Sequence, residues 1–85
     1  MEFGDRNIVG KRVIELRKKT GMKQIELLAK LQVNGVDISA PSLSLLEGQK
    51  RLVTDMEIKA LADIFGVSAD YLLGRVDEPD GKFER

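Results

Sequence analysis

Glycines that follow short amphipathic segments constrain this chain more than any other feature of its sequence. The apolar residues of these segments recur three and four positions apart, which is the spacing of one face of an α-helix. A glycine after such a segment is typical of a helix C-terminus, because glycine readily adopts the left-handed conformation found there. In a chain of 85 residues these glycines leave room only for short helices, and they stand at Gly21, Gly48, Gly66 and Gly74.

These signals predict a compact all-α domain of five helices, at about 5–19, 24–31, 40–47, 55–65 and 69–73. Ser39 and Ser68 are good N-cap residues for the third and fifth helices. The fourth helix begins at a capping box, with Thr54 as the N-cap and Glu57 as the third helical residue. The domain is expected to span residues 5–74. Residues 75–85 are polar and mostly acidic, and we expect them to form a flexible tail.

The connection between the second and third predicted helices, residues 32–39, is open to two interpretations. It contains Asn34-Gly35, the strongest turn signal in the chain. Val33 and Val36 flank this turn, so a very short β-hairpin is an alternative to an irregular loop. In either case a turn joins two short helices, which is the outline of a helix-turn-helix unit.

Cysteine and histidine are both absent from the chain. Their absence excludes disulfides, the usual zinc sites and nucleophile–base pairs that depend on histidine. The sequence contains no phosphate-binding loop or nucleophile elbow, so we expect no catalysis, no cofactor and no metal site. No apolar run is long enough to span a membrane, and no signal peptide is recognisable, so we expect a cytoplasmic protein.

The charged residues are unevenly distributed along a chain whose net charge is zero. Residues 1–51 carry ten Lys or Arg and six Asp or Glu, whereas residues 52–85 carry four and eight. From Arg6 to Lys23 there are seven cations and one anion, Glu15. This division predicts one basic face of the kind that binds nucleic acid, although a solvated helix surface would give the same pattern.

Several short stretches occur in a distinctive order. They are VGKRV and LRKK within residues 9–19, GMKQ at 21–24, EL at 26–27, SLS at 42–44, LEG at 46–48, and LA, FGVS and YLL between residues 61 and 73. In their order and spacing they resemble the XRE family of helix-turn-helix DNA-binding domains, which includes phage repressors and Cro. The resemblance covers roughly residues 7–74 and implies the fold of the lambda repressor domain.

The resemblance also implies how DNA would be bound. The third helix would lie in the major groove, while the second would cross the DNA backbone. Gln24 would hydrogen-bond a phosphate at the start of the second helix, and Lys50 and Arg51 would reach phosphates after the third. The residues expected at the DNA are Lys23, Gln24, Ser39, Ala40, Pro41, Ser42, Ser44, Leu45, Lys50 and Arg51. Ordinary capping, packing and surface solvation are the alternative explanation for these residue types.

Three features differ from the family pattern. The loop at residues 32–39 is longer than the usual turn, and Leu28 stands where a small alanine is common. Ala40, Pro41 and Leu45 occupy positions that face bases, where they can touch thymine methyl groups but cannot make bidentate hydrogen bonds. We therefore expect binding dominated by phosphate contacts, with modest discrimination between bases.

Two further contacts are expected. By the resemblance, Arg17 at the end of the first helix pairs with Glu47 near the end of the third, the alternative being two exposed charges. The end of the domain carries more apolar surface than a short helix can bury against its own domain. This surface predicts a homodimer interface formed by Tyr71, Leu72, Leu73 and Val76.

The sequence therefore predicts a bacterial or phage transcriptional regulator that binds double-stranded DNA as a homodimer, in the manner of a repressor. An antitoxin or a restriction–modification controller would use the same domain. A protein-interaction module that has lost DNA binding is a further alternative, favoured by the low polar content of the third helix.

Overall fold

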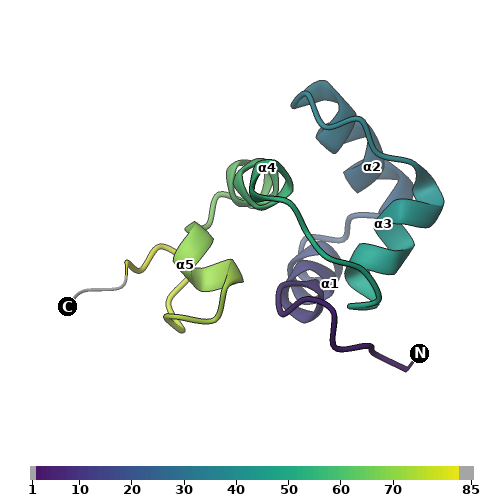
Figure 1. Cartoon of the computed structure of the whole chain (residues 1–85). Helices are drawn as coiled ribbons and strands as arrows, with labels where there is room; N and C mark the ends of the chain where they lie inside the picture. Colours follow the sequence, from purple (N-terminus) through teal and green to yellow (C-terminus); the bar gives the residue numbers. More distant parts are fainter. Residues whose placement is uncertain (1, 83–85) are drawn as a thin grey trace.

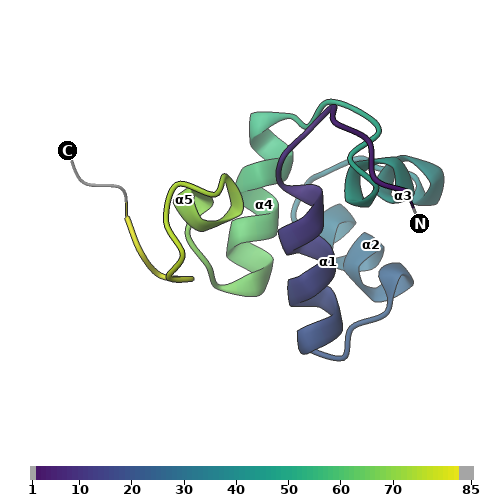
Figure 2. The same ribbon diagram turned by 90° about the horizontal axis from the view of Figure 1, so that it is seen from below.

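The computed structural model describes residues 2–82, and these residues form five helices and no strand. The helices are α1 (Gly10–Lys19), α2 (Gln24–Val33), α3 (Ala40–Glu47), α4 (Asp55–Phe65) and α5 (Ala69–Leu72). The predicted all-α fold is confirmed. In Figures 1 and 2, α2 and α3 lie at one end of the molecule and α5 at the other, with α1 and α4 between them.

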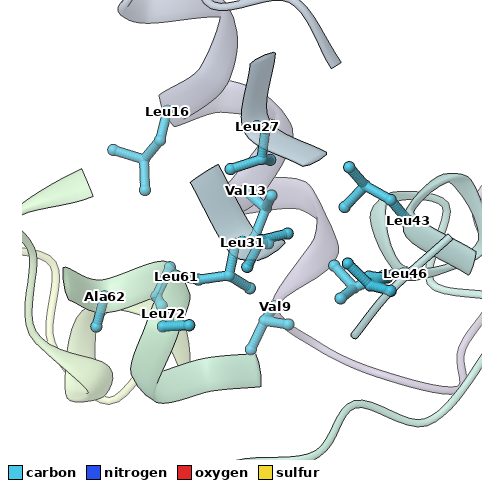
Figure 3. Close-up of a cluster of buried hydrophobic side chains, with 12 residues drawn as sticks. Val9, Val13, Leu16, Leu27, Leu31, Leu43, Leu46, Leu61, Ala62 and Leu72 are labelled. Atoms are coloured by element: carbon cyan, nitrogen blue, oxygen red, sulfur yellow. The ribbon is translucent and has the colours of Figure 1, made fainter. Parts of the chain in front are cut away.

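One hydrophobic core joins all five helices. Figure 3 shows buried side chains from α1, α2, α3, α4 and α5 converging between the helices. Six leucines in this core are fully buried, and they are Leu27, Leu31, Leu43, Leu46, Leu61 and Leu72. Because burying one leucine stabilises a fold by roughly 1.5–3 kcal/mol, these contacts hold helices that are too short to persist alone.

The predicted starts of the last three helices are confirmed. The Oγ of Ser39 accepts a hydrogen bond from the Ser42 N–H, and Thr54 and Glu57 form both halves of a capping box. Ser68 caps α5 by accepting from the Tyr71 N–H. Each cap satisfies backbone donors that the first turn of a helix cannot pair internally.

The first helix begins at Gly10, five residues later than predicted, because Asn7 holds the preceding backbone in another conformation. The Asn7 Oδ1 accepts hydrogen bonds from the N–H groups of Val9 and Gly10, at 3.1 and 2.9 Å. Its Nδ2 donates to the carbonyl oxygens of Leu46 and Arg51. The Asn7 side chain therefore ties the start of α1 to the end of α3.

The hairpin considered for residues 32–39 is wrong. Helix α2 continues to Val33, the turn follows with Gly35 at a φ of 84°, and residues 36–39 carry no regular structure. Ile38 is buried in the core, and its carbonyl oxygen accepts a hydrogen bond from Gln32. The longer loop is therefore anchored to the domain at its far end.

Gly48 ends α3 as predicted, but the left-handed residue is the next one, Gln49, with a φ of 59°. The Gln49 side chain is buried and donates to the Asn7 carbonyl oxygen at 2.8 Å. Gly10 lies against the same corner, where a Cβ would come within 2.6 Å of the Leu46 carbonyl oxygen. Glycine is needed at position 10 because the backbones of α1 and α3 meet there.

The folded part of the chain continues past residue 74, where the sequence placed the domain boundary. Arg12 donates to the carbonyl oxygens of Tyr71 and Val76 at 2.6 and 2.8 Å and forms an ion pair with Asp77. The Pro79 carbonyl oxygen accepts a hydrogen bond from the Ser68 N–H. Part of the predicted tail is therefore fastened to α1 and α5, and its last residues, 83–85, lie outside the described residues.

Within residues 2–82, no helix has the length and apolar character needed to cross a membrane.

Candidate nucleic-acid interface

The first turns of α2 and α3 meet at one end of the molecule, where most of the residues expected at DNA gather. We call this surface the α2–α3 face, and it comprises Lys23, Gln24, Ile25, Ala40, Pro41, Ser44 and Leu45. The Ser44 Oγ donates to the Gln24 Oε1 at 3.3 Å, which joins the two helices across the face. Pro41, Ser44 and Leu45 share one side of α3, since residues three and four apart are neighbours on a helix. All three side chains are exposed.

A buried charge network supports this face from behind. The carboxylate of Glu47 is only 1% exposed, and it accepts from the Nε and Nη2 of Arg17 at 2.8 and 3.1 Å. Arg17 also donates to the Met22 carbonyl oxygen just before α2. The structure thus brings together Arg17 and Glu47, the two residues expected to pair, and their contact fixes α1 against α3.

Gln24 belongs to this network as well as to the surface. Its Nε2 donates to the Glu47 Oε1 at 3.0 Å. The side chain expected to contact a phosphate is therefore oriented by protein groups, and one of its two amide hydrogens is already used. A carboxamide held on both sides loses little freedom when it binds a ligand, which makes it a preorganised donor.

No side chain caps the start of α2. Its N-cap residue is Lys23, which makes no capping hydrogen bond and is exposed to solvent. The first-turn N–H groups and the positive end of the helix dipole favour an anion at this position. The exposed ammonium of Lys23 adds to the same attraction, so this end of α2 suits a phosphate group.

Arg51 has a different role from the one expected. Its Nε donates to the Ser42 carbonyl oxygen, and its Nη1 and Nη2 donate to the Glu57 carboxylate at 2.9 and 2.7 Å. A further bond reaches the Leu52 carbonyl oxygen. The guanidinium closes the loop between α3 and α4, so the prediction that Arg51 extends toward phosphates is corrected.

The same contacts change the titration of Glu57. Burial disfavours the charged form of this carboxylate, but hydrogen bonds from Arg51 and from the Thr54 backbone outweigh it, with help from the Arg51 charge and the Thr54 hydroxyl. The pKa of Glu57 is therefore lowered from its ordinary value. A lowered pKa means that folding stabilises the ionised form.

Sequence reasoning missed Arg6, which the structure places near Lys50. The N–H groups of Gly4 and Arg6 donate to the carbonyl oxygens of Gly48 and Gln49, at 2.8 and 2.9 Å. The N-terminal segment therefore lies along the end of α3, as Figure 2 shows. Arg6 and Lys50 are both exposed, and no local pattern in the sequence signals that their backbones are neighbours.

The expected basic face consists mainly of lysines. Three arginines that were counted toward it, Arg12, Arg17 and Arg51, donate instead to groups within the domain. Lysines on and around α1 and α3 remain exposed, and they are Lys11, Lys18, Lys19, Lys23 and Lys50. The planar guanidinium groups thus organise the fold, while the ammonium groups supply the surface charge.

Leu72 cannot belong to a dimer interface, because its side chain is completely buried beside Leu61 (Figure 3). The predicted interface is corrected at this residue. Of the other three predicted residues, Tyr71 has its ring covered by the guanidinium of Arg12, whose Cζ lies 4.1 Å from the ring centre. Leu73 and Val76 are half-buried.

Leu73 lines an open groove of about 460 Å³ between α4 and α5. This α4–α5 groove is lined by Asp55, Ile58, Lys59, Ala62, Asp63, Val67, Ala69 and Leu73.

Comparison of the chain with protein-family models, curated proteins and solved structures finds no match. Among residues 2–82, no group of three or more acidic, histidine or cysteine side chains is placed to hold a metal ion.

Proposed function

We propose that this protein binds double-stranded DNA through the α2–α3 face and acts as a transcriptional regulator. The observation that carries the proposal is the Arg17–Glu47–Gln24 network. It fastens the start of α2 to the last residue of α3, with exposed side chains in front of the two helices and buried charge behind them. Such a rigid pair of helices is suited to place one helix in a major groove about 12 Å wide and the other against the backbone.

The charge of the exposed groups favours an anionic partner. Lys23 lies at the uncapped start of α2, and Lys50 and Arg6 lie near the end of α3. Phosphate contacts of this kind would supply most of the affinity. Few hydrogen-bonding side chains on α3 are available for base edges, since Ala40, Pro41 and Leu45 have none.

A second copy of the chain is the proposed partner at the opposite end of the molecule. The α4–α5 groove has an apolar floor. Lys59 and Asp63 lie on its rim and form an ion pair, with 3.0 Å between the Lys59 Nζ and the Asp63 Oδ2. A two-fold dimer through this groove would bring the same face of both copies together. Two α3 helices could then engage successive major grooves of one DNA site.

A protein-interaction module is the second candidate function, because Ile25 and Leu45 expose apolar surface on the α2–α3 face. Repression by occupancy of an operator, an antitoxin role and control of a restriction–modification system would all use this surface for DNA. These regulatory roles therefore share one first test, which is binding to duplex DNA.

Fluorescence anisotropy with a labelled random-sequence duplex at two salt concentrations provides this test. We expect saturable binding that weakens steeply as salt rises, because phosphate binding releases counterions. The Lys23→Ala variant should bind less tightly, and Lys30→Ala, at the other end of α2, is the matched control. Absence of binding at low salt would contradict DNA binding and favour the interaction module.

A further inference from the structure

A small apolar recess opens on the α2–α3 face between the first turns of the two helices. Its volume is about 110 Å³, and it is lined by Gln24, Ile25, Leu28, Ala40 and Leu43. Leu43 is fully buried and forms the floor, while Ile25 is 71% exposed and forms one wall. Four of the five lining residues are apolar. The amide of the fifth, Gln24, donates a hydrogen bond to Glu47 and accepts one from Ser44.

Positive charge lies directly beside this recess at the start of α2. Lys23 lies at the uncapped start of α2, directly before two lining residues, Gln24 and Ile25. The partner must therefore present an apolar group close to negative charge. It must also be small, since 110 Å³ is only a few times the roughly 30 Å³ that one water molecule occupies in the liquid.

The major groove of DNA offers one group with these properties. Among the four bases, only thymine presents an apolar substituent there, its C5-methyl group, and the phosphates of the same strand lie nearby. The polar major-groove edges of guanine, adenine and cytosine would find no partner among Ile25, Leu28 and Ala40. An unpaired polar group in an apolar recess costs free energy, so these bases would be disfavoured.

We infer that the recess formed by Ile25, Leu28, Ala40 and Leu43 is a specificity site that receives the C5-methyl group of one thymine. This inference rests on the proposed DNA binding and adds the chemical group that is read. It assigns discrimination to a site shared by α2 and α3, in contrast to the general apolar contact expected of Leu45. Removing the methyl group should therefore weaken binding at one defined position in each half-site.

The test begins with selection of a preferred duplex from a random pool, using the complete wild-type chain. Each thymine of that duplex is then replaced singly by deoxyuridine, which removes the methyl group and leaves every hydrogen-bonding atom in place. Burial of one such group is worth roughly a fourfold change in affinity. We expect a loss of about this size at one thymine per half-site and little change elsewhere.

Two variants tie the effect to the recess. Ala40→Val fills the recess from the α3 side, and Ile25→Ala removes its exposed wall. Both should bring the ratio of thymine to deoxyuridine affinity close to one. Val33→Ala is the matched control, because Val33 is an exposed apolar residue at the other end of α2 that does not line the recess, and this variant should keep the wild-type ratio. Circular dichroism melting curves verify that all three variants fold.

The experiment distinguishes failure of DNA binding from failure of the recess assignment. If the wild type binds no duplex, both the proposed function and this inference are overturned. If it binds duplex but no deoxyuridine substitution weakens binding, or if both Ala40→Val and Ile25→Ala retain the wild-type preference for thymine, DNA binding stands and the recess assignment is overturned.

Discussion

Arg51 and Glu57 face each other across the loop between α3 and α4 in a two-point ion pair, with nitrogen–oxygen distances of 2.9 and 2.7 Å. The same guanidinium binds the Ser42 carbonyl oxygen, and the same carboxylate accepts from the Thr54 N–H. One ion pair therefore connects the α3 backbone to the capping box of α4. Its loss would affect the position of α3 as well as the stability of the domain.

We expect Arg51→Ala to lower the free energy of unfolding by roughly 2–3 kcal/mol, because it leaves the buried Glu57 carboxylate without its main partner. Lys50→Ala, one residue away and exposed, should change it by less than about 0.5 kcal/mol. Urea denaturation of both variants measures the difference. Equal stabilities would contradict the structural role of Arg51.

The lowered pKa of Glu57 predicts a dependence of stability on pH. Folding favours the ionised carboxylate, so its contribution to stability is complete above its ordinary pKa of 4.5 and is lost as the pH falls through the lower folded-state value. Thermal melting of the wild type should therefore show a decline in stability below about pH 4.5. Glu57→Gln should be less stable than the wild type at neutral pH, and its stability should fall less as the pH decreases. Glu26→Gln, at an exposed position, should show the same pH dependence as the wild type.

The pair of Arg17 and Glu47 should behave as a buried interaction. Arg17→Ala is expected to lower the free energy of unfolding by roughly 2–4 kcal/mol, because it strands a carboxylate that is 1% exposed. An exposed pair would give less than about 1 kcal/mol. A double-mutant cycle with Glu47→Ala determines the coupling energy, and a value near zero would show that the two side chains stabilise the fold independently.

Lys50 should contribute to DNA binding through charge alone. Lys50→Ala is expected to weaken binding equally for selected and random duplexes and to reduce the slope of log affinity against log salt by about one. Lys30→Ala should leave the slope unchanged. A loss confined to the selected duplex would indicate that Lys50 reads bases instead.

Ala69→Glu tests the proposed dimer. Ala69 is exposed in the α4–α5 groove, so the substitution places a charge at the proposed contact without entering the core. Sedimentation equilibrium at tens of micromolar protein should show a dimer for the wild type and a monomer for this variant. A wild-type monomer under these conditions, with and without DNA, would refute the interface.

The sequence is informative where structure depends on neighbours along the chain. Ser39, Thr54 and Ser68 cap helices because their hydroxyls reach N–H groups three residues on, and this spacing is visible in the sequence. Helix α5 shows the limit of such reasoning. It has only four residues, too few for periodicity to reveal that Leu72 faces the core.

The hydrogen-bond partners of the arginines could not be predicted from the sequence either. Arg12 binds groups 59 to 65 residues away, and a long side chain with several donors is compatible with either surface or interior. The Arg17–Glu47 pair was expected only because of a family resemblance. Charge counting alone assigned all of these cations to the surface.

The contacts of Arg12 bear on the order of events in folding. The guanidinium on α1 binds Tyr71, Val76 and Asp77, which lie 59 to 65 residues further along the chain. Contacts of such separation require a long loop to close, which costs conformational entropy before any bond is gained. The attachment of α1 to residues 71–77 is therefore a late step, which follows the packing of the helices that lie between them.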